Sequence, residues 1–365
     1  MDTLNKYGAH ASADLVAGAQ AVENALLGIL LSKRTQTGMV INSPQTNDAS
    51  YLIPVSIGTP AQTLMLDLDS GSADLWVFSS ELPANESSGH IIYTPSKSTT
   101  SVQKNGYTWN ITYEDGSGAD GNVFSDKVVV GGATATSQAV EAATSVSTSF
   151  QSNTNNDGLI GLAMSSINTV KPTAQTTFLD TIKSTLPADL FTCTLKHQAP
   201  GHYDFGYINS SSYTGSIYYA PISTARGFWE FNAGAYYVGS TAYPALNDSI
   251  ADTGTSIILA PASVISNYYA HVSNAQYNSQ VGGVIFPCSD TLPTFSVTIG
   301  GSKRTVPGAY LNYVQVGTIS GVAYCYGALQ SNNGLPFTIL GDSFLKSQFV
   351  VFDEGNTRIG FSTQA

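Results

Sequence analysis

Charged side chains are scarce in this chain of 365 residues, and basic ones most of all. Only 11% of the residues are charged, and 14 Lys and Arg stand against 25 Asp and Glu, which gives a net charge of −11. A protein that binds nucleic acid needs a basic surface, so we expect no nucleic-acid partner. With few basic groups, little positive charge accumulates in acid, and self-repulsion stays small there. The composition suits a protein that works at low pH, and it is also that of an ordinary acidic soluble protein.

Cysteine is nearly absent. The three cysteines are Cys193, Cys288 and Cys325. An odd count allows at most one intrachain disulfide, and Cys288 and Cys325, both in the second half, are the economical pair. Cys193 lies in the run 190–195, which is typical of a half-buried strand, so we expect a small buried hydrophobic residue rather than a nucleophile. No Cys or His cluster has the spacing of metal ligands, so no metal is expected.

Long apolar runs are missing as well. The segment Leu15–Leu31 has helical composition, but acidic residues interrupt it, and its apolar part is too short to span a bilayer. No positively charged start followed by an apolar core is visible, so we expect a precursor from which the signal peptide is missing. The dibasic pair Lys33-Arg34 separates this segment from a β-rich one. We interpret residues 1–34 as a pro-segment, Lys33 and Arg34 as a processing site and the mature chain as starting near Thr35.

From about residue 50 the sequence consists of short β-type runs broken by Gly, Asn, Ser and Pro. Runs of this kind are Tyr51–Val55, Trp109–Tyr113, Lys127–Val130 and Phe349–Phe352. Helical patterns are confined to Thr177–Ser184 and Ala262–His271. The Ser/Thr/Asn-rich stretch Ser145–Asn156 is expected to form surface between strands. The sequence therefore predicts a mostly β protein with a few small helices.

The most informative motif, Asp-[Ser/Thr]-Gly-[Ser/Thr], occurs twice, at residues 69–72 and 252–255. One copy would be weak evidence, because short Asp-Gly turns are common. Two copies, 252 − 69 = 183 residues apart, indicate duplicated halves that meet at one site. Two carboxylates brought together in this way can share a proton and act as general base and general acid.

Each position of the repeat has a physical reason. Gly71 and Gly254 allow a tight turn that brings a backbone N–H group to a carboxylate. The hydroxyls of Ser72 and Thr255 can donate to the carboxylates of Asp69 and Asp252, which favours the ionised form.

The middle hydroxyl residues, Ser70 and Thr253, can bond across to the opposing loop. Taken singly, each motif is as well explained as an ordinary turn that ends a strand. Asp67 lies two residues before the first motif and lacks a following [Ser/Thr]-Gly, so we interpret it as structural. A second signature, two apolar residues before a Gly, recurs at 157–161 and 339–342 and supports the duplication.

Long ordered segments resemble the pepsin family of aspartic proteases, and within it the secreted fungal penicillopepsin and aspergillopepsin group. The matching segments are 69–79 (DSGSADLWVFS), 157–163 (DGLIGLA), 195–207 (LKHQAPGHYDFGY), 251–256 (ADTGTS) and 340–353 (LGDSFLKSQFVVFD). The resemblance runs from about residue 50 to residue 365. It implies a bilobal pepsin-like aspartic protease fold, mostly β, with two pseudo-duplicated lobes and a cleft between them. We expect the N-terminal lobe to span 35–208 and the C-terminal lobe 209–365.

The resemblance also implies a mechanism. Asp69 and Asp252 would hold a water that attacks the scissile carbonyl, while the protonated Asp stabilises the oxyanion and then protonates the leaving amine. Aspartic-protease dyads are a known example of two carboxylates that cannot both ionise. No cofactor is implied. The expected partners are protein or peptide substrates and pepstatin-type inhibitors, with no membrane partner, for a monomer secreted from the cell or delivered to the vacuole.

Residues 113–116 are similar to the family's flap, a hairpin that closes over the substrate. Tyr113 would cover the cleft with Trp76 as its hydrogen-bond partner, although an aromatic residue at a hairpin tip is commonly a packing residue. Asp115 resembles the flap acid that lets some fungal members accept Lys, besides large hydrophobic residues, before the cut. Alternatively, Asp115 only makes the turn with Gly116. Glu114 stands where the group usually has Gly.

In the N-terminal segment, Lys6-Tyr7 resembles the pair with which related zymogens plug the cleft. The alternative is an exposed lysine in an unstructured segment. The sequons at Asn85, Asn110 and Asn209, together with a fourth at Asn247, fit a secretory route and glycosylation, although such short motifs also arise by chance.

Two other functions remain open at this stage. One is a binding module of the same fold that has lost catalysis, which the intact Asp motifs argue against. The other is a glycosidase, which also uses two carboxylates. A glycosidase does not need two matching Asp-[Ser/Thr]-Gly turns, so the repeat favours the protease.

Overall fold

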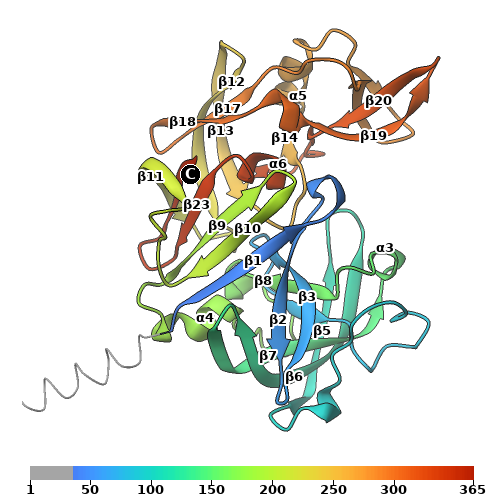
Figure 1. Ribbon diagram of the computed structural model, residues 1–365, viewed down its shortest axis with the longest axis vertical. Helices are drawn as coiled ribbons and strands as arrows, with labels where there is room; N and C mark the ends of the chain where they lie inside the picture. The colour runs from blue at the N-terminus through green and yellow to red at the C-terminus, as the bar shows by residue number, and fades with distance from the viewer. Residues whose placement is uncertain (1–35) are drawn as a thin grey trace, which may run out of the picture.

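The computed structural model describes residues 36–365 (Figure 1). The residues predicted for pro-segment inhibition, Lys6 and Tyr7, and for processing, Lys33 and Arg34, lie outside the described residues. The described chain begins beside the turn that follows helix α4 (Phe178–Ile182), where the Gln36 N–H donates to the Thr185 carbonyl.

Strands dominate the first half of the chain. They are β1 (Gly38–Pro44), β2 (Tyr51–Ile57), β3 (Gln62–Asp69), β4 (Leu75–Val77), β5 (Val102–Thr112), β6 (Gly118–Val130), β7 (Ala133–Val146), β8 (Gly158–Gly161), β9 (Leu190–Lys196) and β10 (Ala199–Phe205). The helices between them are α3 (Thr148–Ser152) and α4 (Phe178–Ile182). The runs expected near residues 51, 109 and 127 are therefore strands, as the sequence predicted.

The second half of the chain also consists mainly of short strands. Its strands are β11 (Tyr213–Ser223), β12 (Glu230–Val238), β13 (Thr241–Ala251), β14 (Ile258–Ala260), β15 (Gln276–Asn278), β16 (Gly283–Pro287), β17 (Phe295–Ile299), β18 (Ser302–Val306), β19 (Asn312–Ile319), β20 (Val322–Gly327), β21 (Leu329–Ser331), β22 (Thr338–Leu340), β23 (Phe349–Asp353) and β24 (Arg358–Gln364). Its helices are α5 (Ala262–Tyr269) and α6 (Asp342–Leu345). Both predicted helices are present, as α4 and α5, each a few residues shorter than expected.

A six-stranded antiparallel sheet joins the two halves, in the order β1, β10, β9, β23, β24, β11. Three strands come from each half, and the halves meet where β9 pairs with β23 in the middle of the molecule (Figure 1). Cys193 lies on β9 opposite Val350 and is buried. The strand 190–195 was expected to be half-buried, but all six residues are buried. A central strand covered on both faces has no solvent side, which explains the difference.

Each lobe places a short strand beside the end of its Asp-bearing segment. In the first lobe, β3 runs parallel to β8 with Asp69 opposite Gly161, and β8 pairs antiparallel with β4. In the second, β13 runs parallel to β22 with Ala251 opposite Leu340, and β22 pairs antiparallel with β14. The same three-strand arrangement therefore presents both motifs at strand ends, as the predicted duplication requires.

Apolar side chains bury this framework. One large cluster spans both lobes and includes Val55, Leu66 and Phe352. A second, smaller cluster around Trp76 and Trp109 lies in the first lobe only. Along β6 buried residues alternate with half-buried ones, except at Val123 and Phe124, which are both buried and pack into different clusters.

The second lobe also carries a separate four-stranded sheet in the order β15, β16, β20, β19. The disulfide Cys288–Cys325 ties this sheet to the segment that follows β16. The cysteine pair favoured by the sequence is therefore the one that forms. In residues 36–365 no helix is long and apolar enough to cross a membrane.

Candidate active site

The first Asp loop begins where β3 ends. Asp69 is 4% exposed, and its carboxylate accepts the Gly71 N–H at 2.7 Å on Oδ1 and the Ser72 hydroxyl at 2.5 Å on Oδ2. The turn forms because Gly71 brings its N–H back toward the residue two positions earlier. Both carboxylate oxygens of Asp69 therefore have a hydrogen-bond donor within its own loop.

The second loop repeats these contacts. Asp252 is 7% exposed and accepts the Gly254 N–H at 2.9 Å on Oδ1 and the Thr255 hydroxyl at 2.7 Å on Oδ2. The two carboxylates are thus held by equivalent donors at equivalent atoms. The outer-oxygen donors proposed from the sequence occupy the expected places.

The middle residues of the two motifs lock the loops together. The Ser70 N–H donates to Thr253 Oγ1 and the Thr253 N–H donates to Ser70 Oγ, both at 3.0 Å. The hydroxyls continue across the junction: Ser70 Oγ donates to the Ala251 carbonyl at 2.9 Å and Thr253 Oγ1 to the Leu68 carbonyl at 2.5 Å. All of these atoms are buried, where an unpaired polar group is costly, so the contacts fix the loops face to face.

The glycines show how closely the loops approach. A Cβ atom on Gly71 would lie 2.5 Å from Asp252 Oδ1, and one on Gly254 would lie closer still to Asp69 Oδ1. Only glycine therefore lets each carboxyl group reach the opposing loop. The sequence motifs, 183 residues apart, form a single site with two acids.

The electrostatics separate the two acids. Burial, reinforced by the negative charge of Asp69, raises the pKa of the Asp252 carboxyl above its ordinary value, against the opposing effect of the Thr255 hydroxyl. Two carboxyl groups this close hold one proton between them, and the titration belongs to the pair. The raised pKa of Asp252 favours a state in which that residue carries the proton. Such a pair can give one proton and take another.

Two further acids lie near the pair without the same donors. Burial first, then the charges of Asp69 and Asp252, raise the pKa of Asp67 well above its ordinary range. Burial first, then Asp67, does the same for Asp342. Within residues 36–365, Asp67 Oδ1 and both carboxyl oxygens of Asp342 have no hydrogen-bond partner. Asp67 therefore lacks the support that distinguishes the two motif acids.

The predicted flap is a hairpin. β5 and β6 pair up to Thr112 opposite Gly118, and the Gly116 N–H donates to the Tyr113 carbonyl at 2.9 Å to close the turn. Gly116 has a φ of 80°, which explains the glycine at this position. Trp76 Nε1 donates to the Tyr113 hydroxyl at 2.8 Å, which is the contact expected from the sequence.

The two acids at the flap tip differ in their contacts. Asp115 Oδ1 accepts both the backbone N–H and the hydroxyl of Ser117, at 2.9 and 2.6 Å. Asp115 therefore shapes the turn through its Oδ1 atom. Glu114 is exposed on the same turn. The hairpin therefore carries one acid that is tied back and one that projects.

Sequence reasoning missed an aromatic partner of the flap. The ring of Phe150, on α3, lies 4.8 Å from the Trp76 ring and 5.8 Å from the Tyr113 ring, edge-on in both cases. The polar stretch 145–156 lies at the surface between β7 and β8, as expected, but it includes the short helix α3, which was not predicted and which carries this ring. A lone Phe in a Ser-rich stretch gives no signal of such a contact.

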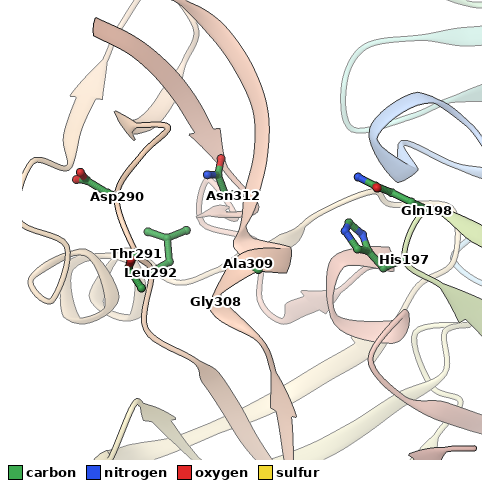
Figure 2. A pocket seen from close by; sticks show the side chains of 8 residues that line it. All are labelled: His197, Gln198, Asp290, Thr291, Leu292, Gly308, Ala309 and Asn312. Carbon is green, nitrogen blue, oxygen red and sulfur yellow. The ribbon is translucent and has the colours of Figure 1, made fainter.

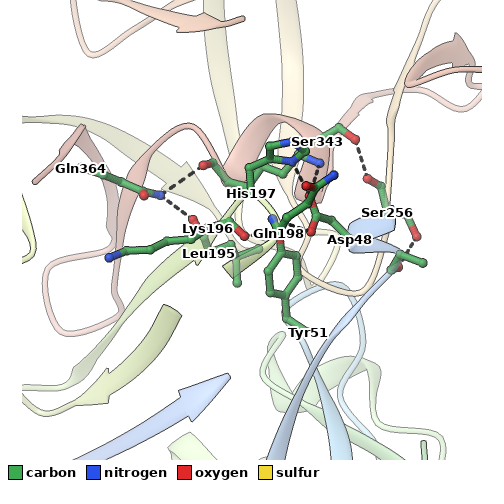
Figure 3. Close-up of polar contacts among 11 residues, drawn as sticks. Asp48, Tyr51, Leu195, Lys196, His197, Gln198, Ser256, Ser343 and Gln364 are labelled. Atoms are coloured by element: carbon green, nitrogen blue, oxygen red, sulfur yellow. Dashed lines mark hydrogen bonds and ion pairs between the residues drawn. The ribbon is translucent and has the colours of Figure 1, made fainter. Parts of the chain in front are cut away.

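A partly buried polar network ties the second loop to the sheet between the lobes (Figure 3). Ser343 Oγ donates to the Ser256 carbonyl at 2.8 Å, and Ser256 Oγ donates to the Ala49 carbonyl. Next to it, Asp48 is paired with Lys346 at 2.8 Å and with His197 at 2.6 Å. The turn between β1 and β2 is thus anchored to the lobe that carries Asp252.

A surface cavity of about 370 Å³ lies beside this network (Figure 2). His197 and Gln198 form one wall, and the other comes from the segments 290–292 and 308–312. Neither motif acid lines it, so the cavity is separate from the two-acid site. Within residues 36–365 no group of His, Cys, Asp and Glu has an arrangement that could hold a metal ion.

Comparison with known proteins links these features to one family. Residues 50–364 match the model of the eukaryotic aspartyl protease family. This span includes both Asp loops, the flap hairpin and the sheet between the lobes.

Several fungal proteins are similar over nearly the whole chain. Penicillopepsin-2 of Penicillium janthinellum is 50% identical over 362 residues, which cover 99% of this chain and 86% of that protein. Penicillopepsin-1 of the same organism is 54% identical over 90% of this chain and 99% of its own length. Aspergillopepsin-1 of Aspergillus fumigatus is 53% identical over 90% of this chain and 82% of its own length.

Proposed function

Because the chain belongs to the eukaryotic aspartyl protease family, and is an aspartic endopeptidase with the bilobal pepsin-like β fold, we propose that Asp69 and Asp252 are its catalytic dyad. The observation that carries this assignment is the pair of equivalent loops, each of which holds its carboxylate against the glycine of the other. Ser70, Gly71 and Ser72 support the first acid, and Thr253, Gly254 and Thr255 support the second.

The proposed reaction uses a water held between the two carboxyl groups. The ionised acid accepts a proton from the water as it attacks the scissile carbonyl, and the protonated acid donates to the developing oxyanion. The leaving amine then takes a proton from the dyad. The raised pKa of Asp252 supports the assignment of the shared proton to that residue in the resting enzyme.

Cleavage of a denatured protein at about pH 3–5 tests this function. We expect Asp69→Asn and Asp252→Asn each to lower kcat/KM by about 10³-fold or more, because either change removes one partner of the proton exchange. Pepstatin should abolish the activity of the unaltered enzyme. Asp248→Asn is the matched control. Asp248 lies on β13, four residues before Asp252, and its half-exposed carboxylate forms an ion pair with Arg226 at 3.3 Å.

The outcomes separate the alternatives. Cleavage that survives in both dyad variants would refute the assignment. Peptide binding without cleavage by the unaltered protein would favour a binding module, and release of sugar from a glycan would favour a glycosidase.

The proposed substrate is an extended peptide between the lobes, paired with the flap as an added strand. The resemblance to the fungal group supports a preference for large hydrophobic residues before the cut, with Lys accepted through Asp115. Tyr113, Trp76, Glu114 and Gly116 would shape the flap side of this site. A peptide library that varies the residue before the cut tests the preference, and loss of Lys acceptance in Asp115→Asn is the expected result.

We also propose that the enzyme is made as a zymogen, with residues 1–34 as pro-segment and Lys33-Arg34 as processing site. Lys6 would place its ammonium between the two acids and Tyr7 would accompany it, until acid protonates the carboxylates. Lys6→Ala should then make the unprocessed chain bind pepstatin more tightly near neutral pH. Unchanged binding would contradict this role.

The remaining proposals concern the protein as a whole. We propose secretion, with the vacuole as the alternative destination, and a monomer whose lobes divide near residue 208. The sequons at Asn85, Asn110 and Asn247 have exposed asparagines, which supports glycosylation there, whereas Asn209 is half-buried and its amide oxygen accepts from Ser211. Mass spectrometry of the secreted protein before and after removal of glycans tests these sites.

A further inference from the structure

Two buried acids of the first lobe lie under the Asp69 loop and take no part in the proposed reaction. Asp74 lies two residues after Ser72, the last residue of the loop, and is 0% exposed. Glu141, on β7, is 1% exposed. The strand register places Glu141 opposite Trp76, which bonds the flap residue Tyr113. The two acids therefore lie between the loop and the base of the flap.

A single asparagine bridges the two acids. Asn168 Nδ2 lies 2.9 Å from Glu141 Oε1 and 3.4 Å from Asp74 Oδ1, and it also lies 3.1 Å from the Ala73 carbonyl. Asp74 Oδ1 further accepts the Thr169 N–H and hydroxyl, at 3.0 and 2.6 Å. One carboxyl oxygen of each acid is thus fully satisfied.

The other oxygen of each acid is not. Within residues 36–365, Asp74 Oδ2 and Glu141 Oε2 are buried and have no donor. Two buried carboxylates held by one amide, each with a free oxygen, are unstable if both carry charge, because no basic side chain of residues 36–365 pairs with either acid to offset the repulsion. A proton shared between the two free oxygens removes one charge and supplies the missing donor.

The surrounding groups reinforce this conclusion. Neither acid forms an ion pair with any residue of the described chain. Asp69, in the loop before Asp74, and Tyr113, bonded to the Trp76 that lies opposite Glu141, are the other titratable groups that interact electrostatically with the pair. Burial first, then the charge of Asp74, raises the pKa of Glu141 well above its ordinary value. The titratable neighbours are thus an acid and a phenol, and neither stabilises a second negative charge.

The pair is connected to the dyad through the backbone. The Gly161 N–H donates to the Asp74 carbonyl at 2.9 Å, and the Leu162 N–H donates to the Asp69 carbonyl at 2.7 Å. Asn168 holds the Ala73 carbonyl between these two points. A movement of Asp74 or Asn168 is therefore transmitted to the loop that carries Asp69.

We propose that Asp74 and Glu141 share one proton and form a positioning pair for the Asp69 loop, and that loss of this proton as the pH rises sets the neutral limit of activity. The link to activity rests on the proposed function of Asp69. Because the folded state holds the proton to a higher pH than the unfolded chain does, stability that is present in acid is lost as the pH rises. The proton leaves to solvent, and the two carboxylates then repel each other.

Glu141→Gln is the decisive variant. A glutamine amide can donate to Asp74 Oδ2 without any titrating proton, so the contact persists at neutral pH. We expect a rise of about one unit in the pH at which half of the folded protein's tryptophan fluorescence is lost. The neutral limb of the kcat/KM profile should shift to higher pH with it. Two tryptophans report on this region. Trp76 is on the strand beside Glu141, and the ring of Trp109 lies 6.0 Å from that of Trp76.

Asp74→Asn provides a second variant should the first fold poorly, and the same upward shift is expected. Since one proton serves both acids, the double variant should shift little further than either single one. Asp126→Asn is the matched control: Asp126 is a buried acid of the same lobe, but its partners are the hydroxyls of Tyr93, Ser98 and Thr100. The control should lower stability at every pH without raising the midpoint.

The outcomes are distinct. An unchanged fluorescence midpoint in Glu141→Gln or Asp74→Asn, with circular dichroism at pH 4 like that of the unaltered protein, overturns the shared proton. A fluorescence midpoint that rises while the kcat/KM limb stays overturns the positioning role. Failure of the unaltered protein to cleave at pH 4 refutes the proposed function, while the fluorescence midpoint still decides whether the proton is shared.

Discussion

The two lobes hold their acids in the same way and support them differently. In both, a strand parallel to a short partner strand ends at an Asp loop, and a glycine N–H and a hydroxyl bond the same two carboxylate oxygens. Gly161 packs against the backbone at Asp74 in the first lobe, and Gly341 packs against the backbone at Ile257 in the second. The position of the buried acid Asp74 is thus occupied by an apolar side chain in the second lobe.

The lobes also differ in the structural features that surround the Asp loops. The first lobe has the flap, a separate aromatic cluster and the Asp74–Glu141 pair, whereas the second has the disulfide and the four-stranded sheet. Duplication is retained where two groups must meet symmetrically. Outside the loops the lobes differ, with the hairpin and the acid pair in the first and the disulfide in the second.

The largest expected difference between the lobes comes from the disulfide. Cys288 and Cys325 close a loop of 37 residues, and in the chain-entropy model this constraint is worth about 4 kcal/mol. Replacing both by Ala should lower the free energy of unfolding of the second lobe by that amount, measured by urea denaturation in an Asp69→Asn background that prevents self-digestion. Cys193→Ala, the buried free cysteine, should cost about 1 kcal/mol. An equal loss in the two variants would contradict the prediction.

The loop glycines test whether the lobes are equivalent at the dyad. A methyl group on Gly71 would meet the Asp252 carboxyl, and one on Gly254 would meet that of Asp69. Gly71→Ala and Gly254→Ala should each lower kcat/KM by about 100-fold through displacement of the carboxyl groups. Gly317→Ala, with nothing within 4 Å of the added carbon, should have no such effect. A large loss in only one loop variant would break the symmetry.

The outer hydroxyls reveal which acid carries the charge. Ser72→Ala and Thr255→Val each remove a donor that favours an ionised carboxylate, so the apparent pKa of the dyad rises. Since the proposed reaction needs one ionised acid, the acid limb of kcat/KM should move to higher pH, by up to about one unit. The shift should be larger for Ser72→Ala, because the raised pKa of Asp252 assigns the shared proton to that residue. Equal shifts would argue against that assignment.

The smallest expected effect belongs to the flap, which only the first lobe has. Tyr113→Phe removes the 2.8 Å bond from Trp76 and leaves the ring contacts in place. The loss of one such bond, about 1 kcal/mol, should lower kcat/KM by about 5-fold. Tyr277→Phe, on a residue that is 70% exposed, is the control. No change in Tyr113→Phe would show that the aromatic packing alone holds the flap.

Much of the fold could be predicted where the signal is local. The alternating or continuous apolar runs predicted strands, and the helices α4 and α5 were expected at their observed places. The helix α3 was not expected, because its five residues are mostly polar and lie within a stretch that has no apolar periodicity. The burial of β9 on both faces was also missed, since it depends on the neighbouring strands β10 and β23 rather than on its own residues.

The same division applies to the site. Trp76 and Tyr113 were expected to bond through resemblance to a family, and they do. Phe150 and Glu141 gave no signal, because each is an ordinary residue in its own segment. Their roles arise from partners far along the chain. Asn168, for example, bonds both Asp74, 94 residues away, and Glu141, 27 residues away.

The sequence by itself determined the chemistry of each Asp loop, because the bonds that hold the carboxylates run over two or three residues and depend only on a glycine and a hydroxyl at fixed spacing. The tertiary structure decided that the two loops share one site. Burial of the strands that carry them, and the crossed bonds of Ser70 and Thr253, bring together carboxyl groups from residues 183 positions apart. The tertiary structure also decided which other acids of the described residues are buried without a basic partner. Burial and pairing depend on how distant segments pack, and no short stretch of sequence contains that information.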